Sequence, residues 1–103
     1  MEIETIYKLL KLIEGTPGIS QRTLAKKMNV SLGKANYCMQ ALIKKGWVKA
    51  KNFKKSPNKK GYIYVLTPKG VSERAHVTTK FLKRKIDEFE EIKREIKQLK
   101  KEV

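Results

Sequence analysis

The feature that most restricts the fold is a pair of short amphipathic segments, each preceded by a serine and joined to the other by a brief turn. Ser20 precedes the first segment, which runs to Met28, and Ser31 precedes the second, which ends at Gly46. A serine in this position can accept a hydrogen bond from a free backbone N–H of the first helical turn. Two short helices joined by about three residues, the second opening on a serine, are the helix-turn-helix signature.

Apolar residues recur at intervals of three and four, as expected of helices that bury one face. A helix over residues 2–14 is predicted to precede the pair and to stop at the glycines and proline of residues 15–18. The residues expected to face inward are Ile3, Ile6, Tyr7, Leu10 and Ile13 in this helix, Leu24, Ala25 and Met28 in the second, and Ala35, Cys38, Met39 and Leu42 in the third. Gly46 is expected to end the third helix in a left-handed conformation.

After Gly46 the apolar period changes to two. Residues 47–53 and 62–66 are therefore predicted to form strands, and residues 54–61 between them are rich in turn formers and lysine. A β-hairpin that follows a helix-turn-helix is a wing. The predicted class is thus α+β, mostly α, with a winged helix-turn-helix of three helices and a β-hairpin wing over residues 1–67.

Residues 68–103 are predicted to form one long coiled-coil helix. Thr67 is placed to cap it, Pro68 suits its first position, and no further proline follows. Roughly 36 helical residues would extend about 54 Å, which is more than the preceding domain can cover. An apolar stripe, interrupted at Lys85, falls on a heptad register and consists of Leu82, Phe89, Ile92, Ile96, Leu99 and Val103.

This exposed stripe predicts a homodimer in which the same helix of a second chain covers it. The two helices could run parallel or antiparallel, because Lys85 on the seam and Phe81 and Ile86 beside it loosen the register. A helix folded back on its own domain is the alternative to pairing.

The central part of the chain is basic and free of acids. Between Gly15 and Ser72 there are thirteen Lys or Arg residues and no Asp or Glu, although the whole chain has 10 Asp or Glu. The formal net charge is +15. A solvated surface normally mixes its signs, so a single-sign stretch that also holds core residues indicates a polyanionic partner, and double-stranded DNA is the first candidate.

The same composition argues against several other classes. With no carboxylate in residues 15–72 and a lone His76, neither catalysis, a metal site nor a cofactor is expected. Cys38 is the only cysteine, which excludes an intrachain disulfide. Apolar runs are far shorter than the roughly 18–20 residues that span a bilayer, and the acidic N-terminus lacks signal-peptide features. The protein is expected to be cytoplasmic and not an enzyme.

The third helix is expected to read base edges through its outward polar residues, Lys34, Asn36, Tyr37 and Gln40. Lysine can donate to guanine, and Asn or Gln can pair bidentately with adenine. The residues expected to contact the DNA backbone lie on the second helix, at the start of the third and on the wing. They are Ser20, Gln21, Arg22 and Lys26; Ser31 and Gly33; and Lys51, Lys54, Lys55, Asn58, Lys59 and Lys60.

The positive charge by itself is also compatible with partners other than DNA. An acidic protein would satisfy the same face, which would make the winged domain an interaction module with only incidental DNA binding. RNA would fit the charge too, but ribonucleoprotein aromatic motifs and glycine-rich clamp loops are absent. A membrane surface would require a basic amphipathic helix with Trp or Phe on its apolar face, whereas the C-terminal helix has mixed charge and a narrow stripe.

Several stretches resemble the MarR family of winged-helix transcriptional regulators. The matching stretches are Ile19-Ser20-Gln21-Arg22-Thr23-Leu24-Ala25, then Val30-Ser31 with Ala35 through Leu42, then Lys45-Gly46-Trp47-Val48, and finally Leu66-Thr67-Pro68-Lys69-Gly70. More narrowly, Ser31-Leu32-Gly33-Lys34-Ala35-Asn36-Tyr37-Cys38 and Phe81-Leu82-Lys83-Arg84-Lys85 resemble a short subgroup, the EPS-associated MarR-type regulators. The subgroup implies a role near genes for extracellular polysaccharide synthesis.

The chain departs from the family pattern in two places. Longer members form their dimer from helices at both ends, with effector pockets near that interface, whereas here a single long C-terminal helix is expected. The wing also lacks the family's frequent acidic-then-arginine pattern, so minor-groove reading by arginine does not carry over. Neither the residues nor the resemblance identifies the operator, the regulated genes, the sign of regulation or an effector.

Overall fold

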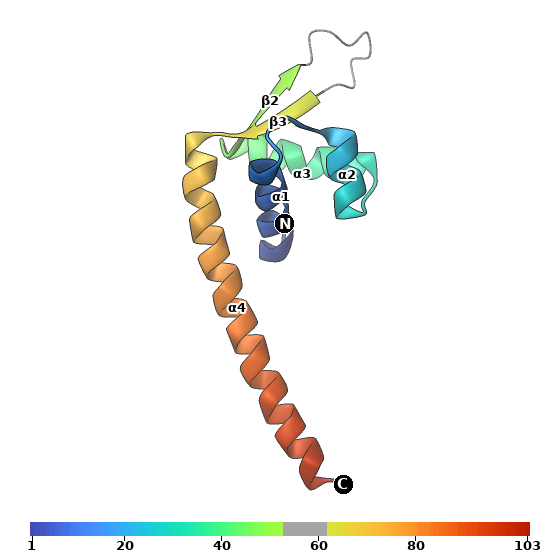
Figure 1. The fold of residues 1–103 in the computed structure, drawn as a ribbon, viewed down its shortest axis with the longest axis vertical. Helices are drawn as coiled ribbons and strands as arrows, with labels where there is room; N and C mark the ends of the chain where they lie inside the picture. Colours follow the sequence, from blue (N-terminus) through green and yellow to red (C-terminus); the bar gives the residue numbers. More distant parts are fainter. Residues whose placement is uncertain (53–61) are drawn as a thin grey trace.

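Four helices and three strands build the part of the chain that the computed structural model describes, residues 1–52 and 62–103 (Figure 1). They are α1 (Ile3–Gly15), β1 (Ile19–Ser20), α2 (Gln21–Met28), α3 (Leu32–Lys44), β2 (Val48–Asn52), β3 (Tyr62–Leu66) and α4 (Pro68–Lys101). The fold is the predicted one, a mostly helical α+β winged helix-turn-helix with a long C-terminal helix.

Both predicted serine caps hold the helix-turn-helix in shape. The Oγ of Ser20 accepts a hydrogen bond from the backbone N–H of Thr23 at 3.1 Å, and the Oγ of Ser31 accepts one from Lys34 at 3.1 Å. Between the two helices, Asn29 adopts a left-handed conformation with φ 55°. These local interactions end α2 and restart the chain as α3, as the sequence predicted.

The sheet contains one strand more than the two predicted. β1 pairs antiparallel with β3, placing Ile19 opposite Tyr64 and Ser20 opposite Ile63. β2 pairs with the other edge of β3, in register from Val48 opposite Leu66, so that the strand order is β1-β3-β2. Two residues carry no period-two pattern, and for this reason β1 could not be recognised from the sequence.

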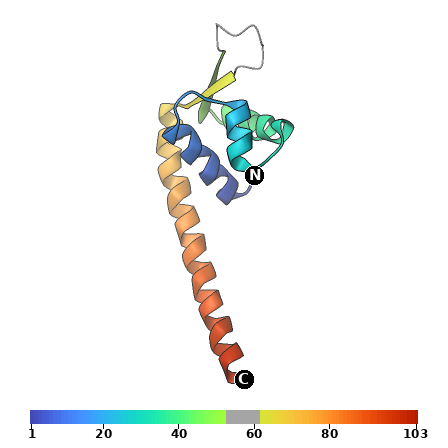
Figure 2. The same cartoon turned by 45° about the vertical axis from the view of Figure 1, so that its right-hand side comes forward.

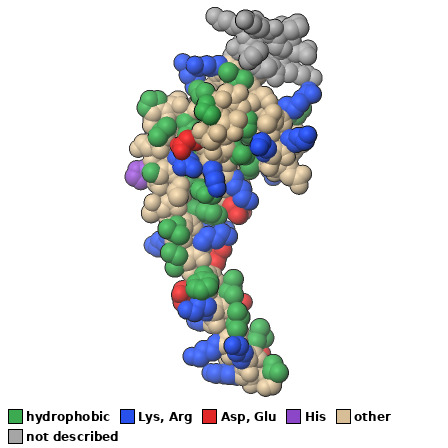
Figure 3. Space-filling model, in the orientation of Figure 1, with side chains coloured by type: hydrophobic (Ala, Val, Ile, Leu, Met, Phe, Trp, Pro, Cys, Tyr) green, Lys and Arg blue, Asp and Glu red, His purple; other side chains and the backbone are tan. Residues whose placement is uncertain are grey.

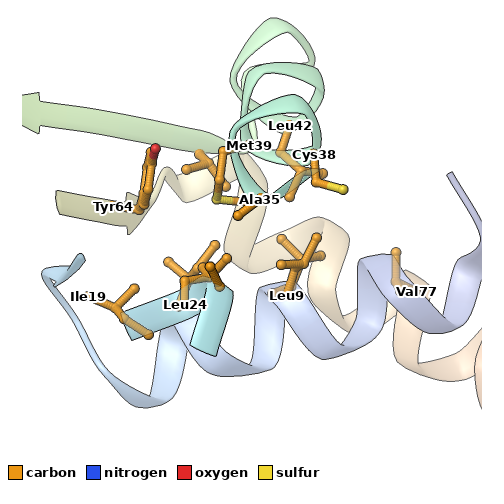
Figure 4. Close-up of a cluster of buried hydrophobic side chains, with 13 residues drawn as sticks. Leu9, Ile19, Leu24, Ala35, Cys38, Met39, Leu42, Tyr64 and Val77 are labelled. Atoms are coloured by element: carbon orange, nitrogen blue, oxygen red, sulfur yellow. The ribbon is translucent and has the colours of Figure 1, made fainter. Parts of the chain in front are cut away.

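A buried cluster joins all three helices of the domain to the sheet and to α4 (Figure 4). Leu24 and Ala25 from α2 and all four predicted α3 residues lie in it. In α1, Leu10 and Ile13 are buried, and Ile3, Ile6 and Tyr7 are partly buried and pack against the cluster, as predicted. Leu9 was not among the predicted residues and is buried as well. Leu9 lies in a cluster that also contains residues of α2, α3 and α4, and α4 packs beside α1.

The two tyrosines of β3 point to one face of the sheet but differ in environment. Tyr64 is 1% exposed, whereas Tyr62 is 42% exposed. The Oη of Tyr64 donates a hydrogen bond to Oε1 of Gln21 at 3.2 Å, which gives the buried hydroxyl a partner. Tyr64 is therefore a core residue that reaches α2.

The end of α3 and the start of α4 are joined at one junction. Gly46 takes φ 77°, as predicted, and the chain turns into β2. The Oγ1 of Thr67 accepts a hydrogen bond from the N–H of Gly70 at 3.0 Å and donates one to the carbonyl of Gly46. The N–H of Thr67 donates to the carbonyl of Trp47 at 3.1 Å. Thr67 thus caps α4 and also holds its first turn against the end of α3.

The first turns of α4 pack on α1, and the rest of the helix projects from the domain (Figures 1 and 2). Val77 is part of the core, the rings of Phe81 and Tyr7 stack with centroids 4.8 Å apart, and Arg74 pairs with Glu14 at 3.2 Å. Beyond these contacts the helix extends away, so the molecule measures 64 by 27 by 20 Å. Among the helices described, none is long and apolar enough to cross a membrane.

Candidate nucleic-acid interface

The four predicted base-reading residues all lie on the exposed side of α3. Lys34, Asn36, Tyr37 and Gln40 are exposed, and Tyr37 keeps 74% of its surface accessible. They point outward because Ala35, Cys38, Met39 and Leu42 occupy the opposite face of the same helix and are buried. This face therefore presents an ammonium group, two amides and a phenol to solvent, which are groups that can hydrogen-bond to base edges and phosphates.

The start of α3 is open around Gly33. A Cβ built on Gly33 would meet only the Ser31 Oγ, at 4.0 Å. The Oγ of Ser31 accepts the hydrogen bond that caps α3, so this oxygen already has a partner within the protein. The open space at Gly33 lets an external partner approach the backbone N–H groups of the first turn, where the helix dipole favours an anion.

The residues predicted on α2 divide into two kinds. Arg22 and Lys26 are exposed and free to contact phosphate. Gln21 is half-buried and engaged in hydrogen bonds within the protein, because its Nε2 donates to the carbonyl of Leu32 at 3.1 Å while its Oε1 accepts from Tyr64. Ser20 caps α2 and donates to the Oγ1 of Thr23 at 2.9 Å. The sequence pattern marked Gln21 as a polar surface residue, and only the fold shows that it links α2, α3 and β3.

The wing prediction can be followed only in part. Lys51 lies on β2 and is exposed. The other predicted wing residues, Lys54, Lys55, Asn58, Lys59 and Lys60, lie outside the described residues. The structure places Lys49 on the same strand, exposed like Lys51, although it had not been chosen as a site residue. Their alternation with Val48 and Ala50 along β2 is the signal that could have found it.

The described basic residues of α2, α3 and β2 have no carboxylate partner. Every ion pair found within residues 1–52 and 62–103 lies on α1 or α4. In Figure 3, Lys and Arg side chains lie over the side of the domain formed by α2 and α3, without acidic side chains among them. Positive charge that is not neutralised within the protein is available to an anionic partner.

Where the structure describes the chain, it contains no group of His, Cys, Asp or Glu side chains that could hold a metal ion. Cys38 is a buried free thiol in the core, as expected. Burial, with a smaller contribution from neighbouring Tyr62, raises the pKa of Tyr64 above its usual value of 10.0. Burial thus favours the neutral phenol, which donates the hydrogen bond to Gln21.

A cleft of about 460 Å³ separates part of α1 from the end of α2. Its lining residues are Tyr7, Lys8, Lys11, Leu12, Gly15, Thr16, Lys27 and Met28. None of these belongs to the predicted DNA-contacting set, so the cleft is a separate feature of the domain.

Two short helices that meet at a capped turn, followed by a β-hairpin, define a winged helix-turn-helix. Residues 4–49 match the family model described as winged helix-turn-helix DNA-binding. The chain therefore has a winged helix-turn-helix fold, and its residues 4–49 are similar to winged helix-turn-helix DNA-binding domains.

Known structures with a similar fold include FabT and several MarR proteins. FabT from Streptococcus pneumoniae in complex with DNA is 18% identical with a TM-score of 0.63, and the match covers 82% of this chain and 57% of that chain. Wild-type MarR from E. coli is 28% identical with a TM-score of 0.63, over 73% of this chain and 54% of that chain. A MarR protein from Peptoclostridium difficile is 25% identical with a TM-score of 0.66, over 82% and 53%.

The chain spans little more than half the length of these structures. No curated protein matches it.

Proposed function

We propose that the protein is a sequence-specific, double-stranded DNA-binding transcriptional regulator of the MarR type that acts as a homodimer. The observation that carries this proposal is the surface of α2 and α3, where exposed polar and basic side chains have no acidic partner in the described structure. Similar folds have been solved on DNA, namely FabT and a MarR mutant from E. coli bound to operator DNA.

The roles follow from the geometry of the helix-turn-helix. α3 would enter the major groove with Lys34, Asn36, Tyr37 and Gln40 near base edges, and Arg22 and Lys26 of α2 would contact phosphates. Gly33 and Lys51 would add backbone contacts at the two ends of this surface. Gln21 would act indirectly, because it holds the start of α3 against α2 and β3.

In this proposal, residues 1–67 form the DNA-binding domain and residues 68–103 form the dimerisation helix. The stripe of Leu82, Phe89, Ile92, Ile96, Leu99 and Val103 is exposed in the single chain, as is Ile86. Contiguous apolar surface of this kind marks an interaction site, and a second copy of the helix would cover it. A two-fold dimer would present two α3 helices to half-sites roughly 34–36 Å apart.

Selection of binding sites from random DNA duplexes tests the main proposal. A sequence-specific regulator returns a motif, and a two-fold dimer returns a palindromic one. A module that docks on an acidic protein, and binds DNA only incidentally, returns no motif and overturns the proposal.

Sedimentation of the intact protein and of a version that ends near Arg84 tests the dimer. We expect a dimer for the first and a monomer for the second. A monomeric intact protein, or an undiminished dimer after truncation, would remove the C-terminal helix as the dimer interface.

We also propose that the regulated genes serve extracellular polysaccharide synthesis. This proposal rests only on the resemblance to the EPS-associated MarR-type regulators. The motif returned by selection can be searched upstream of such genes in the organism of origin. Its absence there would reject this assignment and leave DNA binding untouched.

A further inference from the structure

The exposed part of α4 carries charges of opposite sign on the two sides of its apolar stripe. In the heptad that places Leu82, Phe89, Ile96 and Val103 at a, the g positions after Phe81 are Glu88, Glu95 and Glu102. The e positions after Ile86 are Lys93 and Lys100. One edge of the stripe is therefore acidic and the other is basic.

We propose that two copies of α4 pair as a parallel, in-register coiled coil. This inference rests on the homodimer proposed above and adds its orientation. In a parallel pair, each g residue faces the e residue five positions later on the partner helix. Glu88 then faces Lys93 of the second chain, and Glu95 faces Lys100, so that symmetry produces four attractive pairs.

The antiparallel alternative brings like charges together. In that arrangement g positions face g positions and e positions face e positions. Depending on the register, Glu88 then lies near a second Glu88 or near Glu95, which is repulsive. The signs of the charges therefore select the parallel orientation.

Of the four residues needed for these pairs, Glu88 and Lys93 make ion pairs within their own helix, with Arg84 and Lys85 and with Glu90 respectively. Within the described structure, Glu95 and Lys100 make no ion pair. In one heptad of the seam, Ile96 at a and Leu99 at d are the combination that favours two strands over three or four, whereas the preceding heptad has Phe89 at a and Ile92 at d. The seam thus fits one further copy of the same helix.

Lys85 marks where the two helices separate. It occupies a d position, where two lysines would face each other across the seam. In the structure its Nζ instead reaches Glu88 of its own chain at 3.1 Å and lies 5.3 Å from the ring centroid of Phe81. Phe81 stacks on Tyr7 of its own domain. The paired segment consequently begins after Lys85, and the two winged domains diverge from the same end of the coil.

Charge reversal tests the orientation directly. Glu95→Lys and Lys100→Glu each convert two attractive pairs into repulsive ones in the parallel dimer. An exposed ion pair changes an association constant by no more than about fivefold, so each single variant should raise the dimer dissociation constant roughly tenfold. The double variant Glu95→Lys/Lys100→Glu restores attraction and should return close to the wild-type value.

Matched controls make the same charge changes away from the seam. Glu91→Lys and Lys101→Glu lie at c and f positions, on the outer side of the helix. Sedimentation equilibrium should show little change for both. In the antiparallel register that places Glu95 near Glu88 of the second chain, Glu95→Lys instead replaces a repulsive contact with an attractive one and tightens the dimer. In the register that places Glu88 near a second Glu88, Glu95 faces Phe81 and the substitution has little effect.

A single cysteine gives an independent readout. Val103→Cys places two thiols opposite each other at the end of a parallel pair, and mild oxidation should link them, while the native Cys38 is buried. A wild-type dimer that is unaffected by Glu95→Lys, and whose Val103→Cys variant does not cross-link, overturns the orientation but leaves the homodimer in place. A wild-type monomer overturns both.

Discussion

The carbonyl oxygen of Trp47 occupies the place where a side chain on Gly70 would begin. A Cβ built on Gly70 would lie 1.9 Å from that oxygen and 2.9 Å from the Trp47 carbonyl carbon. Both are backbone atoms, and Trp47 also accepts the hydrogen bond of Thr67 through the same oxygen. The close approach of α4 to the end of α3 therefore requires glycine at position 70, although glycine is otherwise unfavourable in a helix.

Gly70→Ala should destabilise the domain by about 1–3 kcal/mol, because backbone atoms must move to admit the methyl group. Urea denaturation of both proteins measures the loss. Gly15→Ala is the matched control, since nothing lies within 4 Å of its Cβ position at the end of α1. An equal effect of the two substitutions would contradict a specific clash at Trp47.

Tyr64→Phe should cost about 1 kcal/mol of stability at neutral pH, because it removes the hydrogen bond to Gln21 and leaves that amide oxygen without its donor. The cost should also depend on pH. Since burial raises the pKa of Tyr64 in the folded state, the unfolded chain ionises first as pH rises above 10.0. The stability advantage of the wild type over Tyr64→Phe should then shrink. A constant difference across that range would argue against a buried, protonated phenol.

Asn36→Ala and Lys26→Ala should weaken DNA binding in different ways. Loss of a base-reading amide should cost about 1–3 kcal/mol on the selected site and relax preference at one base position. Loss of a phosphate contact should weaken all sequences to a similar extent. Titrations with the selected duplex and its single-base variants distinguish the two. Identical profiles would contradict the assignment of α3 to base reading and α2 to the backbone.

The affinity for DNA should fall steeply with salt. If each subunit neutralises about four phosphates, the plot of log K against log salt for a dimer should have a slope near −7. Lys26→Ala should reduce the magnitude of that slope by about 1 for each subunit. Fluorescence anisotropy at several salt concentrations measures both values. A flat response would show that phosphate contacts do not drive binding.

Much of this fold was predictable because its signals are local. The caps at Ser20, Ser31 and Thr67 act within one helical turn, and the inward face of α3 follows from spacing along a single helix. The same spacing places Lys34, Asn36, Tyr37 and Gln40 away from that inward face, and the structure leaves them exposed. The class of domain and its most exposed candidate residues could therefore be predicted from the chain alone.

Only the tertiary structure decided features that depend on contacts between distant segments. β1 exists because Ile19 pairs with Tyr64, Leu9 is buried in a cluster built from several elements, and Phe81, beside the stripe, stacks on Tyr7. Gln21 changed from a surface residue to an internal link for the same reason. Spacing along a helix or strand determines which side of that element a residue occupies. Packing across the whole domain determines which other element covers that side of the helix or strand. The local sequence pattern therefore cannot predict it.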